Sequence, residues 1–348
     1  MKPYVYGAFL LIVLMVFQGC ANGTSAPSIA SMPANKFPSL KEWMSTAKSD
    51  DMPEQPIVLG FSQLGTESAW RMANTSSVRE AAKESGISLV FKNAEQSQEK
   101  QFEAVREFIR MKVDVIAIAP VVESGWEDTL REAKLAGIPI VILDRFVNVE
   151  DTSLFVTTIG SDFHEEGVKA GKYLLDKMRN RPGPIRIAEL QGTAGSTPSI
   201  RRGEGFRSMI GENGDMIITQ SAPADFTESK GKEVMKEFLK APAEKRPHVL
   251  FAHNDEMAIG AIEAIEEAGL TPGKDIAILS VDGSRRALQL LAEGKLDAVV
   301  ECNPLQGPLL MQAAKEIMAG RTLPKRMVPP EDIFTQERAA KEVGRRKF

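Results

Sequence analysis

From Ile57 onward the chain alternates short apolar runs with longer stretches of helical spacing, and this rhythm constrains the fold more than any other feature. The runs are continuously apolar, which is typical of strands covered on both faces. Strand–helix–strand order imposes parallel pairing through crossover helices. Because two successive sets of runs occur, the sequence predicts an α/β fold with two doubly wound, parallel-sheet lobes. The expected strands are 57–62, 87–92, 113–119, 138–144 and 155–160 in the first lobe, and 184–190, 216–222, 248–252, 275–281 and 296–301 in the second.

Length and charge support this prediction and narrow the class of partner. A chain of 348 residues is too long for one ordinary domain and suits two lobes of moderate size. The net charge is −4, so no basic excess favours a nucleic-acid partner. The chain has two cysteines, Cys20 and Cys302. If Cys20 serves as an anchor, no intramolecular disulfide can form and the fold depends on its hydrophobic core.

The amino terminus has the features of an export signal. Lys2 precedes an apolar run over 8–17, which is shorter than the ~20 residues that a membrane-spanning helix needs. The sequence FQGC, ending at Cys20, resembles a lipoprotein cleavage box. We therefore expect residues 1–20 to be a lipoprotein signal peptide, with lipid attached to Cys20. The alternative is an ordinary secretory signal cut near Ala21, which would remove the cysteine; either way the protein leaves the cytoplasm.

The next segment, 21–56, is rich in Ser, Ala, Pro and Asn and has no strand pattern. Such a composition cannot bury enough apolar surface to become ordered. We expect a disordered tether that holds the folded part away from the membrane.

Polar and aromatic residues follow several of the expected strands, at the edge where doubly wound sheets bind ligands. Carboxylates accept hydrogen bonds from hydroxyl groups, arginines and amides donate them, and aromatic rings pack on C–H faces. This mixture predicts a site for one small sugar. The residues at these strand ends are Ser68, Trp70, Arg71, Asp144, Arg145, Arg202, Asn254 and Asp282.

Most of these residues also have an ordinary structural explanation. Asp144 and Arg145 could form a loop ion pair, and Asn254 could cap the helix that follows it. Asp282 could belong to a plain turn, and Arg202 could be solvated at a helix start. The aromatic residues could belong to the core, as large aromatics usually do: Trp70 and Phe226.

Longer segments resemble the periplasmic binding proteins of the ribose/galactose type, and within them the galactofuranose-binding proteins of bacterial sugar importers. The resemblance covers roughly residues 57 to 335. It is carried by GFSQLGTESAWR (60–71), APVVESGW (119–126), PIVILDR (139–145), AELQGTAGS (188–196), RGEGF (202–206), DFTESKGKEVM (225–235), AHNDEMAIGAIEAIEEAGLTPGKDI (252–276) and DGS (282–284).

The resemblance implies where the ligand contacts lie. A glutamine that the family often has near the last crossing is replaced here by Cys302. That departure puts one hydroxyl contact, and with it the identity of the sugar, in question. The implied contacts are Ser68, Trp70, Arg71, Asp144, Arg145, Ser161, Arg202, Phe226, Asn254 and Asp282.

The resemblance also implies Rossmann-like lobes joined by a three-crossing hinge, as in type I periplasmic binding proteins. We expect the crossings near Ser161, residues 301–303 and Asp332. The amino-terminal lobe would then be 57–161 with 303–332, and the carboxy-terminal lobe 162–302 with 333–348.

The implied function is that of an extracytoplasmic, periplasmic or cell-surface solute-binding protein of an ABC sugar importer. Two lobes would close on a galactofuranose- or galactose-like monosaccharide, and the closed monomer would meet a membrane permease. We expect no cofactor and no metal. The alternative is a sugar sensor that feeds a membrane kinase or chemoreceptor. An enzyme is disfavoured because no G-x-S-x-G elbow or phosphate-binding GxxxxGK[ST] loop occurs. A repressor is disfavoured because an export signal stands where a helix-turn-helix would be.

Overall fold

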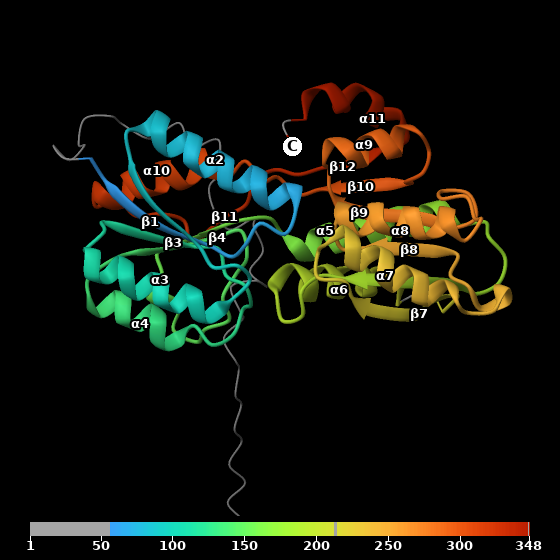
Figure 1. Ribbon diagram of the computed structural model, residues 1–348, viewed down its shortest axis with the longest axis horizontal. Helices are drawn as coiled ribbons and strands as arrows, with labels where there is room; N and C mark the ends of the chain where they lie inside the picture. Colours follow the sequence, from blue (N-terminus) through green and yellow to red (C-terminus); the bar gives the residue numbers. More distant parts are fainter. Residues whose placement is uncertain (1–55, 212–213, 347) are drawn as a thin grey trace, which may run out of the picture.

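The computed structural model describes residues 56–211, 214–346 and 348, and these form two lobes side by side (Figure 1). The predicted signal peptide, Cys20 and nearly all of the predicted tether lie outside the described residues. Each lobe is built on a six-stranded sheet with helices on both faces. The strand order is β11-β5-β4-β3-β1-β2 in the first sheet and β12-β10-β9-β8-β6-β7 in the second. This architecture confirms the predicted fold class.

Every apolar run that the sequence singled out forms a strand. The central strands β3, β4, β8 and β9 are buried along their whole length, as expected for strands covered on both faces. The strands are β1 (Val58–Gln63), β2 (Ser88–Asn93), β3 (Val115–Ile118), β4 (Ile140–Leu143), β5 (Thr157–Ile159), β6 (Ile185–Gln191), β7 (Met216–Pro223), β8 (Val249–Ala252), β9 (Ala277–Asp282), β10 (Ala298–Glu301), β11 (Arg326–Met327) and β12 (Ile333–Thr335).

The helices connect these strands, and most begin with a side-chain cap. Ser68 caps α2, for example, by accepting a hydrogen bond from the backbone N–H of Arg71. The α-helices are α2 (Ala69–Ser85), α3 (Gln98–Met111), α4 (Glu127–Leu135), α5 (Phe163–Met178), α6 (Thr197–Ile210), α7 (Glu228–Leu239), α8 (Asp255–Glu267), α9 (Arg285–Ala292), α10 (Gly307–Met318) and α11 (Gln336–Glu342). Short 3₁₀ turns lie at Thr152–Leu154, Ala243–Lys245 and Val343–Arg345.

Strand pairing is parallel throughout both sheets except at one edge. There β12 pairs antiparallel with β10, with Val299 opposite Phe334. The sequence analysis predicted neither β11 nor β12, because these strands of two and three residues lie in segments without a long apolar run. β12 arrives directly from the other lobe instead of through a crossover helix, so it is free to run in the opposite direction.

The chain passes between the two sheets three times. It leaves the first sheet after β5, returns after β10, and leaves again between β11 and β12. The carboxyl ends of strands from both sheets therefore face each other where the lobes meet (Figure 1).

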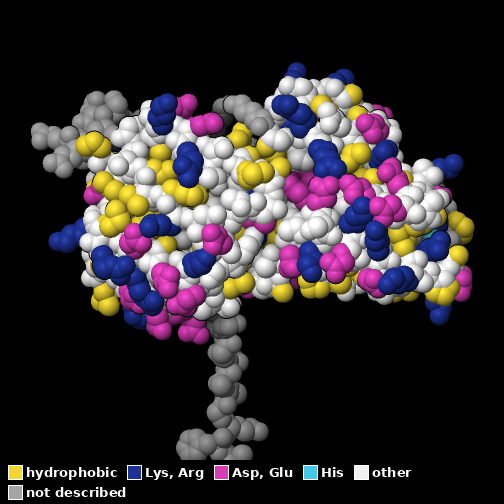
Figure 2. Space-filling model, viewed as in Figure 1, with side chains coloured by type: hydrophobic (Ala, Val, Ile, Leu, Met, Phe, Trp, Pro, Cys, Tyr) yellow, Lys and Arg dark blue, Asp and Glu magenta, His cyan; other side chains and the backbone are white. Residues whose placement is uncertain are grey.

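Two further observations concern the exterior. Charged side chains of both signs are interspersed over the face seen in Figure 2. Among the described residues, no helix is both long and apolar enough to cross a membrane.

Candidate functional site

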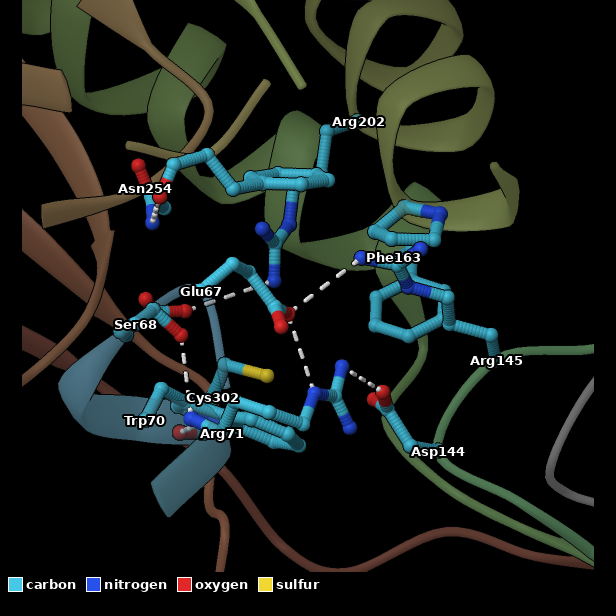
Figure 3. Close-up of a pocket in the computed structure, with 13 residues that line it drawn as sticks. Glu67, Ser68, Trp70, Arg71, Asp144, Arg145, Phe163, Arg202, Asn254 and Cys302 are labelled. Carbon is cyan, nitrogen blue, oxygen red and sulfur yellow. Dashed lines mark hydrogen bonds and ion pairs between the residues drawn. The ribbon is translucent and has the colours of Figure 1, made fainter. Parts of the chain in front are cut away.

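A cavity with about 310 Å³ of empty space lies between the lobes. The side chains around it come from strand ends and helix starts of both lobes (Figure 3). The residues that line it are Glu67, Ser68, Trp70, Arg71, Asp144, Arg145, Phe163, Pro198, Arg202, Phe226, Asn254, Asp282 and Cys302.

Of the residues predicted to contact a ligand, only Ser161 does not line this cavity. Its hydroxyl lies behind the wall, 3.3 Å from the Cys302 sulfur, and donates to Glu331 at 2.6 Å. Four lining residues were not predicted. Glu67 lies within the first loop that the sequence marked, and Cys302 was noted only as a departure from the family pattern. Phe163 and Pro198 begin helices of the second lobe, where the sequence gives no signal of a site.

The first lobe contributes a compact cluster of ionic groups. Arg71 donates from Nη2 to Asp144 at 2.6 Å and from Nε to Glu67 at 3.1 Å. The Nη2 atom of Arg145 lies 3.9 Å from the same Glu67 carboxylate. Burial alone would raise the pKa of Glu67, but the guanidinium groups of Arg71 and Arg145 hold it below its ordinary value. Burial, together with repulsion from Arg71, lowers the pKa of Arg145 to about 10, so this arginine is still charged at neutral pH.

Three of the predicted site residues have an unusual backbone conformation. Asp144, Phe226 and Asp282 have φ angles of 63°, 61° and 125°. Side chains rarely adopt such angles, and residues that do so cluster at functional sites. Neighbouring glycines make the room. A Cβ on Gly160 would lie 2.3 Å from the Asp144 carbonyl oxygen, and one on Gly192 would lie 1.8 Å from the Phe226 ring.

The second lobe places Arg202 at the cavity with support from behind. Its Nε donates to Glu166 at 2.6 Å, and Nη1 donates to the carbonyl of His253. The nearest oxygen of Asp282 is 3.7 Å from Nη2 of Arg202, too far for a hydrogen bond. Burial raises the pKa of Asp282 well above its ordinary value, although Arg202 opposes that shift. Arg202 is buried, so the prediction that it could be a solvated residue is wrong.

Aromatic rings supply the apolar surfaces of the cavity. Trp70 donates from its indole Nε1 to the Cys302 carbonyl at 2.8 Å, which fixes its ring across the junction of the lobes. Arg145 lies 5.3 Å from the Phe226 ring centre, and Arg202 lies 5.3 Å from that of Phe163. Trp70 belongs to a buried core cluster, as the core interpretation expected, and its side chain also lines the cavity.

Asn254 likewise combines a structural role with its place in the wall. Its Oδ1 accepts from the backbone N–H of Met257 and caps α8, as the sequence suggested. Its Nδ2 donates to the Phe226 carbonyl at 3.2 Å and to Glu256 at 2.8 Å. Both amide hydrogens have protein acceptors, so Oδ1 is the atom with capacity left for a ligand.

The lobes also contact each other directly around the cavity. Phe146 N–H donates to the Thr197 hydroxyl, which donates in turn to the Phe146 carbonyl, both at 3.1 Å. On another side, the Ala69 N–H donates to Glu256 at 2.7 Å. These contacts join α2 and the loop after β4 in the first lobe to α6 and α8 in the second. The structure therefore shows the lobes closed on one another.

Two polar atoms in the wall lack partners within the described part of the chain. They are Oε2 of Glu67 and Nε of Arg145, both buried. A buried polar atom without a hydrogen bond costs ~1–3 kcal/mol, so a ligand that satisfies these atoms gains that amount. The wall carries equal numbers of acids and arginines, which suits a ligand without net charge. These residues are Glu67, Asp144 and Asp282, with Arg71, Arg145 and Arg202.

Comparison with known proteins places the chain in a family. The model for the periplasmic binding protein domain matches residues 59–322. The chain belongs to the periplasmic binding protein family. Among its relatives is the galactofuranose-binding protein YtfQ of Escherichia coli K12, 40% identical over 306 residues that cover 87% of this chain and 96% of that protein.

Two solved structures have 47% sequence identity to this chain, and the second is of a periplasmic binding protein. One, from Mycobacterium smegmatis in complex with β-D-fucofuranose, has a TM-score of 0.81 and covers 83% of this chain and 94% of its own. The other is from the arabinose ABC transporter of Shewanella sp. ANA-3, bound to α- and β-L-arabinofuranose. Its TM-score is 0.80, and it covers 83% of this chain and 95% of its own.

Family membership confirms several expectations at once. The fold is that of a periplasmic binding protein, and the family consists of binding proteins rather than enzymes. The location it implies is periplasmic, or more generally extracytoplasmic.

Proposed function

We propose that the chain is the solute-binding protein of an ABC sugar importer and that it holds one furanose sugar, of the galactofuranose class, in the cavity between its lobes. The observation that carries this proposal is the composition of the wall. Three acids and three arginines from the two lobes lie there with aromatic rings, and two buried polar atoms have no hydrogen-bond partner among the described residues. A neutral molecule rich in hydroxyl groups satisfies such a wall.

The side chains divide the work by their chemistry. Asp144 and the free oxygen of Glu67 accept hydrogen bonds from ring hydroxyls, and Arg145 donates from its free Nε. Arg202 and Asp282, which belong to the second lobe, bind other hydroxyl groups of the sugar. Ser68 has its hydroxyl beside the cavity, and the aromatic rings of Trp70, Phe163 and Phe226 pack against the C–H faces of the sugar.

Closure links binding to delivery. Without sugar the lobes, 57–161 with 303–332 and 162–302 with 333–348, separate about the three crossings. With sugar they close, and the joined surface meets the permease. The protein acts as a monomer, held at the membrane by a lipid on Cys20.

Thermal unfolding in the presence of pentoses and hexoses, with galactofuranose included, tests this function. A ligand that binds only the native state raises its stability by RT ln(1 + [L]/Kd), which is about 2.7 kcal/mol at a concentration of 100 Kd. We expect furanose-forming neutral sugars to raise the melting temperature by several degrees, and sugar acids or amino acids to leave it unchanged. Stabilisation by a charged solute alone would contradict the proposal.

A further inference from the structure

If the proposed function holds, the cavity also selects among furanose sugars. We propose that Cys302 forms a wall that offers only weak hydrogen bonds, so that the site prefers a pentofuranose or a 6-deoxyhexofuranose to a hexofuranose with a full hydroxymethyl end. The sulfur is directed toward the cavity, among the labelled side chains of Arg71, Arg202 and Glu67 (Figure 3).

The backbone holds Cys302 firmly in place. Its N–H donates to the Asp282 carbonyl at 3.0 Å, and its carbonyl accepts from the Trp70 indole at 2.8 Å. Both partners are themselves cavity residues. The cysteine is only 1% exposed, so its side chain has no solvent-facing rotamer to adopt. Whatever part of the ligand reaches this corner must therefore meet the thiol.

The thiol stays neutral in this position. Burial raises the pKa of Cys302 well above its ordinary value, and the carboxyl groups of Glu166 and Glu331 reinforce that shift. A neutral thiol is a weak donor and a weak acceptor. Its near neighbour behind the wall is the Ser161 hydroxyl, at 3.3 Å.

Two carboxylates that do not line the cavity lie beside the sulfur, those of Glu166 and Glu331. Glu166 accepts from Arg202 at 2.6 Å, and Glu331 accepts from Ser161 at 2.6 Å and from the Asn303 N–H at 2.8 Å. These hydrogen bonds connect the crossings between the lobes to the cavity wall, and they leave the thiol as the surface that the ligand meets.

The consequence is a preference at one end of the sugar. The charged groups of both lobes take up the ring hydroxyls, while a methyl group or C–H edge packs against the sulfur without loss. A sugar hydroxyl in the same place gives up its hydrogen bonds to water and gains only weak ones from the thiol. An apolar pocket rejects an added hydroxyl by at most ~100-fold, and we expect roughly ten-fold here. The ligands named for the two relatives at 47% identity fit this class, because fucose is a 6-deoxyhexose and arabinose a pentose.

Calorimetric titration of the whole secreted protein with D-fucose and D-galactose tests the proposal, since these sugars differ only in the hydroxyl on C6. We expect the wild type to bind D-fucose about ten-fold more tightly. Cys302→Ser places a strong hydrogen-bonding group in the same corner. It should lower the ratio of the Kd for D-galactose to the Kd for D-fucose about five-fold or more. Cys302→Val keeps the wall apolar and should leave the ratio within about two-fold of the wild type. The fraction of a sugar that is in the furanose form is the same for every variant. It therefore does not affect the change in Kd for one sugar between variants.

The outcomes separate this inference from the function on which it rests. If both sugars bind but the ratio is unchanged in Cys302→Ser, or if the wild type prefers D-galactose, the role of Cys302 is wrong and the sugar-binding function stands. If no neutral sugar binds, the proposed function fails and the inference fails with it. Melting curves of both variants without sugar show whether each is folded, and L-arabinose provides a second ligand without a C6 hydroxyl.

Discussion

The first lobe holds its share of the cavity charges in contact with one another, whereas the second lobe holds its acid apart. Arg71 bonds Asp144 at 2.6 Å and Glu67 at 3.1 Å, so the first wall is a connected network. In the second wall, Arg202 donates to Glu166 behind the cavity. The nearest oxygen of Asp282 lies 3.7 Å from Nη2 of Arg202. The first wall is therefore arranged before a ligand arrives, while Asp282 depends on the ligand for its hydrogen bonds. If the proposed function holds, this difference predicts that the sugar binds the first lobe firmly and that the second lobe completes the site on closure.

Removal of Asp144 should have the largest effect on affinity. Asp144→Ala takes away a hydrogen-bond acceptor and leaves the buried guanidinium of Arg71 with one acid partner fewer. We expect a loss of about 1.5–3 kcal/mol, or roughly ten- to hundred-fold in Kd by calorimetry. Asp144→Asn, which tolerates the positive φ of this position, is the matched control and should lose less. Wild-type affinity in the alanine variant would remove this residue from the site.

Neutralising Asp282 should cost less, and the contrast with Asp144 tests the difference between the walls. Burial raises the pKa of Asp282 well above its ordinary value and so disfavours its charged form, whereas Asp144 is held in an ion pair with Arg71. Asp282→Asn should therefore weaken binding by only about three- to five-fold, near 1 kcal/mol. A larger loss of affinity in Asp282→Asn than in Asp144→Asn would show that the second lobe, and not the first, binds the sugar more firmly.

The smallest effect should be a pH dependence at the contact between the lobes. Burial, reinforced by the nearby Asp255 and Glu67 carboxylates, raises the pKa of Glu256 to about 7 in the closed form. When the lobes separate, Glu256 loses its contact with Ala69 and returns toward its ordinary pKa of 4.5. A raised pKa stabilises the closed form fully below pH 4.5, and this contribution is lost as pH rises through 7.

Sugar affinity should therefore fall by about three-fold between pH 5.5 and 8, a modest change because the carboxyl is partly exposed. Glu256→Gln, which carries no titrating proton, should bind with nearly constant affinity over this range. An equal slope in the variant would assign the pH dependence to another group.

The sequence predicted the fold well because its signals are local. Continuous apolar runs located the strands, and the polar residues that end them marked the side of each sheet that faces the cavity. Asp144 and Asp282 were predicted for this reason, since each directly follows or ends a buried strand.

What the sequence did not reveal depends on the closed arrangement of the lobes. Phe163 and Pro198 lie at helix starts and reach the cavity only because the second lobe folds over the first. Glu67 gains its role from two arginines, of which Arg145 is distant in the chain. Ser161 was expected at the ligand and lies behind Cys302 instead, because the first crossing runs beneath the cavity wall.

A crystal structure of the protein grown with L-arabinose or D-fucose tests the central claim most directly. We predict density for one sugar in the cavity, with Asp144 and Arg145 from the first lobe and Arg202 and Asp282 from the second within ~2.7–3.2 Å of its oxygens. A sugar bound elsewhere, or one that contacts a single lobe while the other remains apart, would contradict the account.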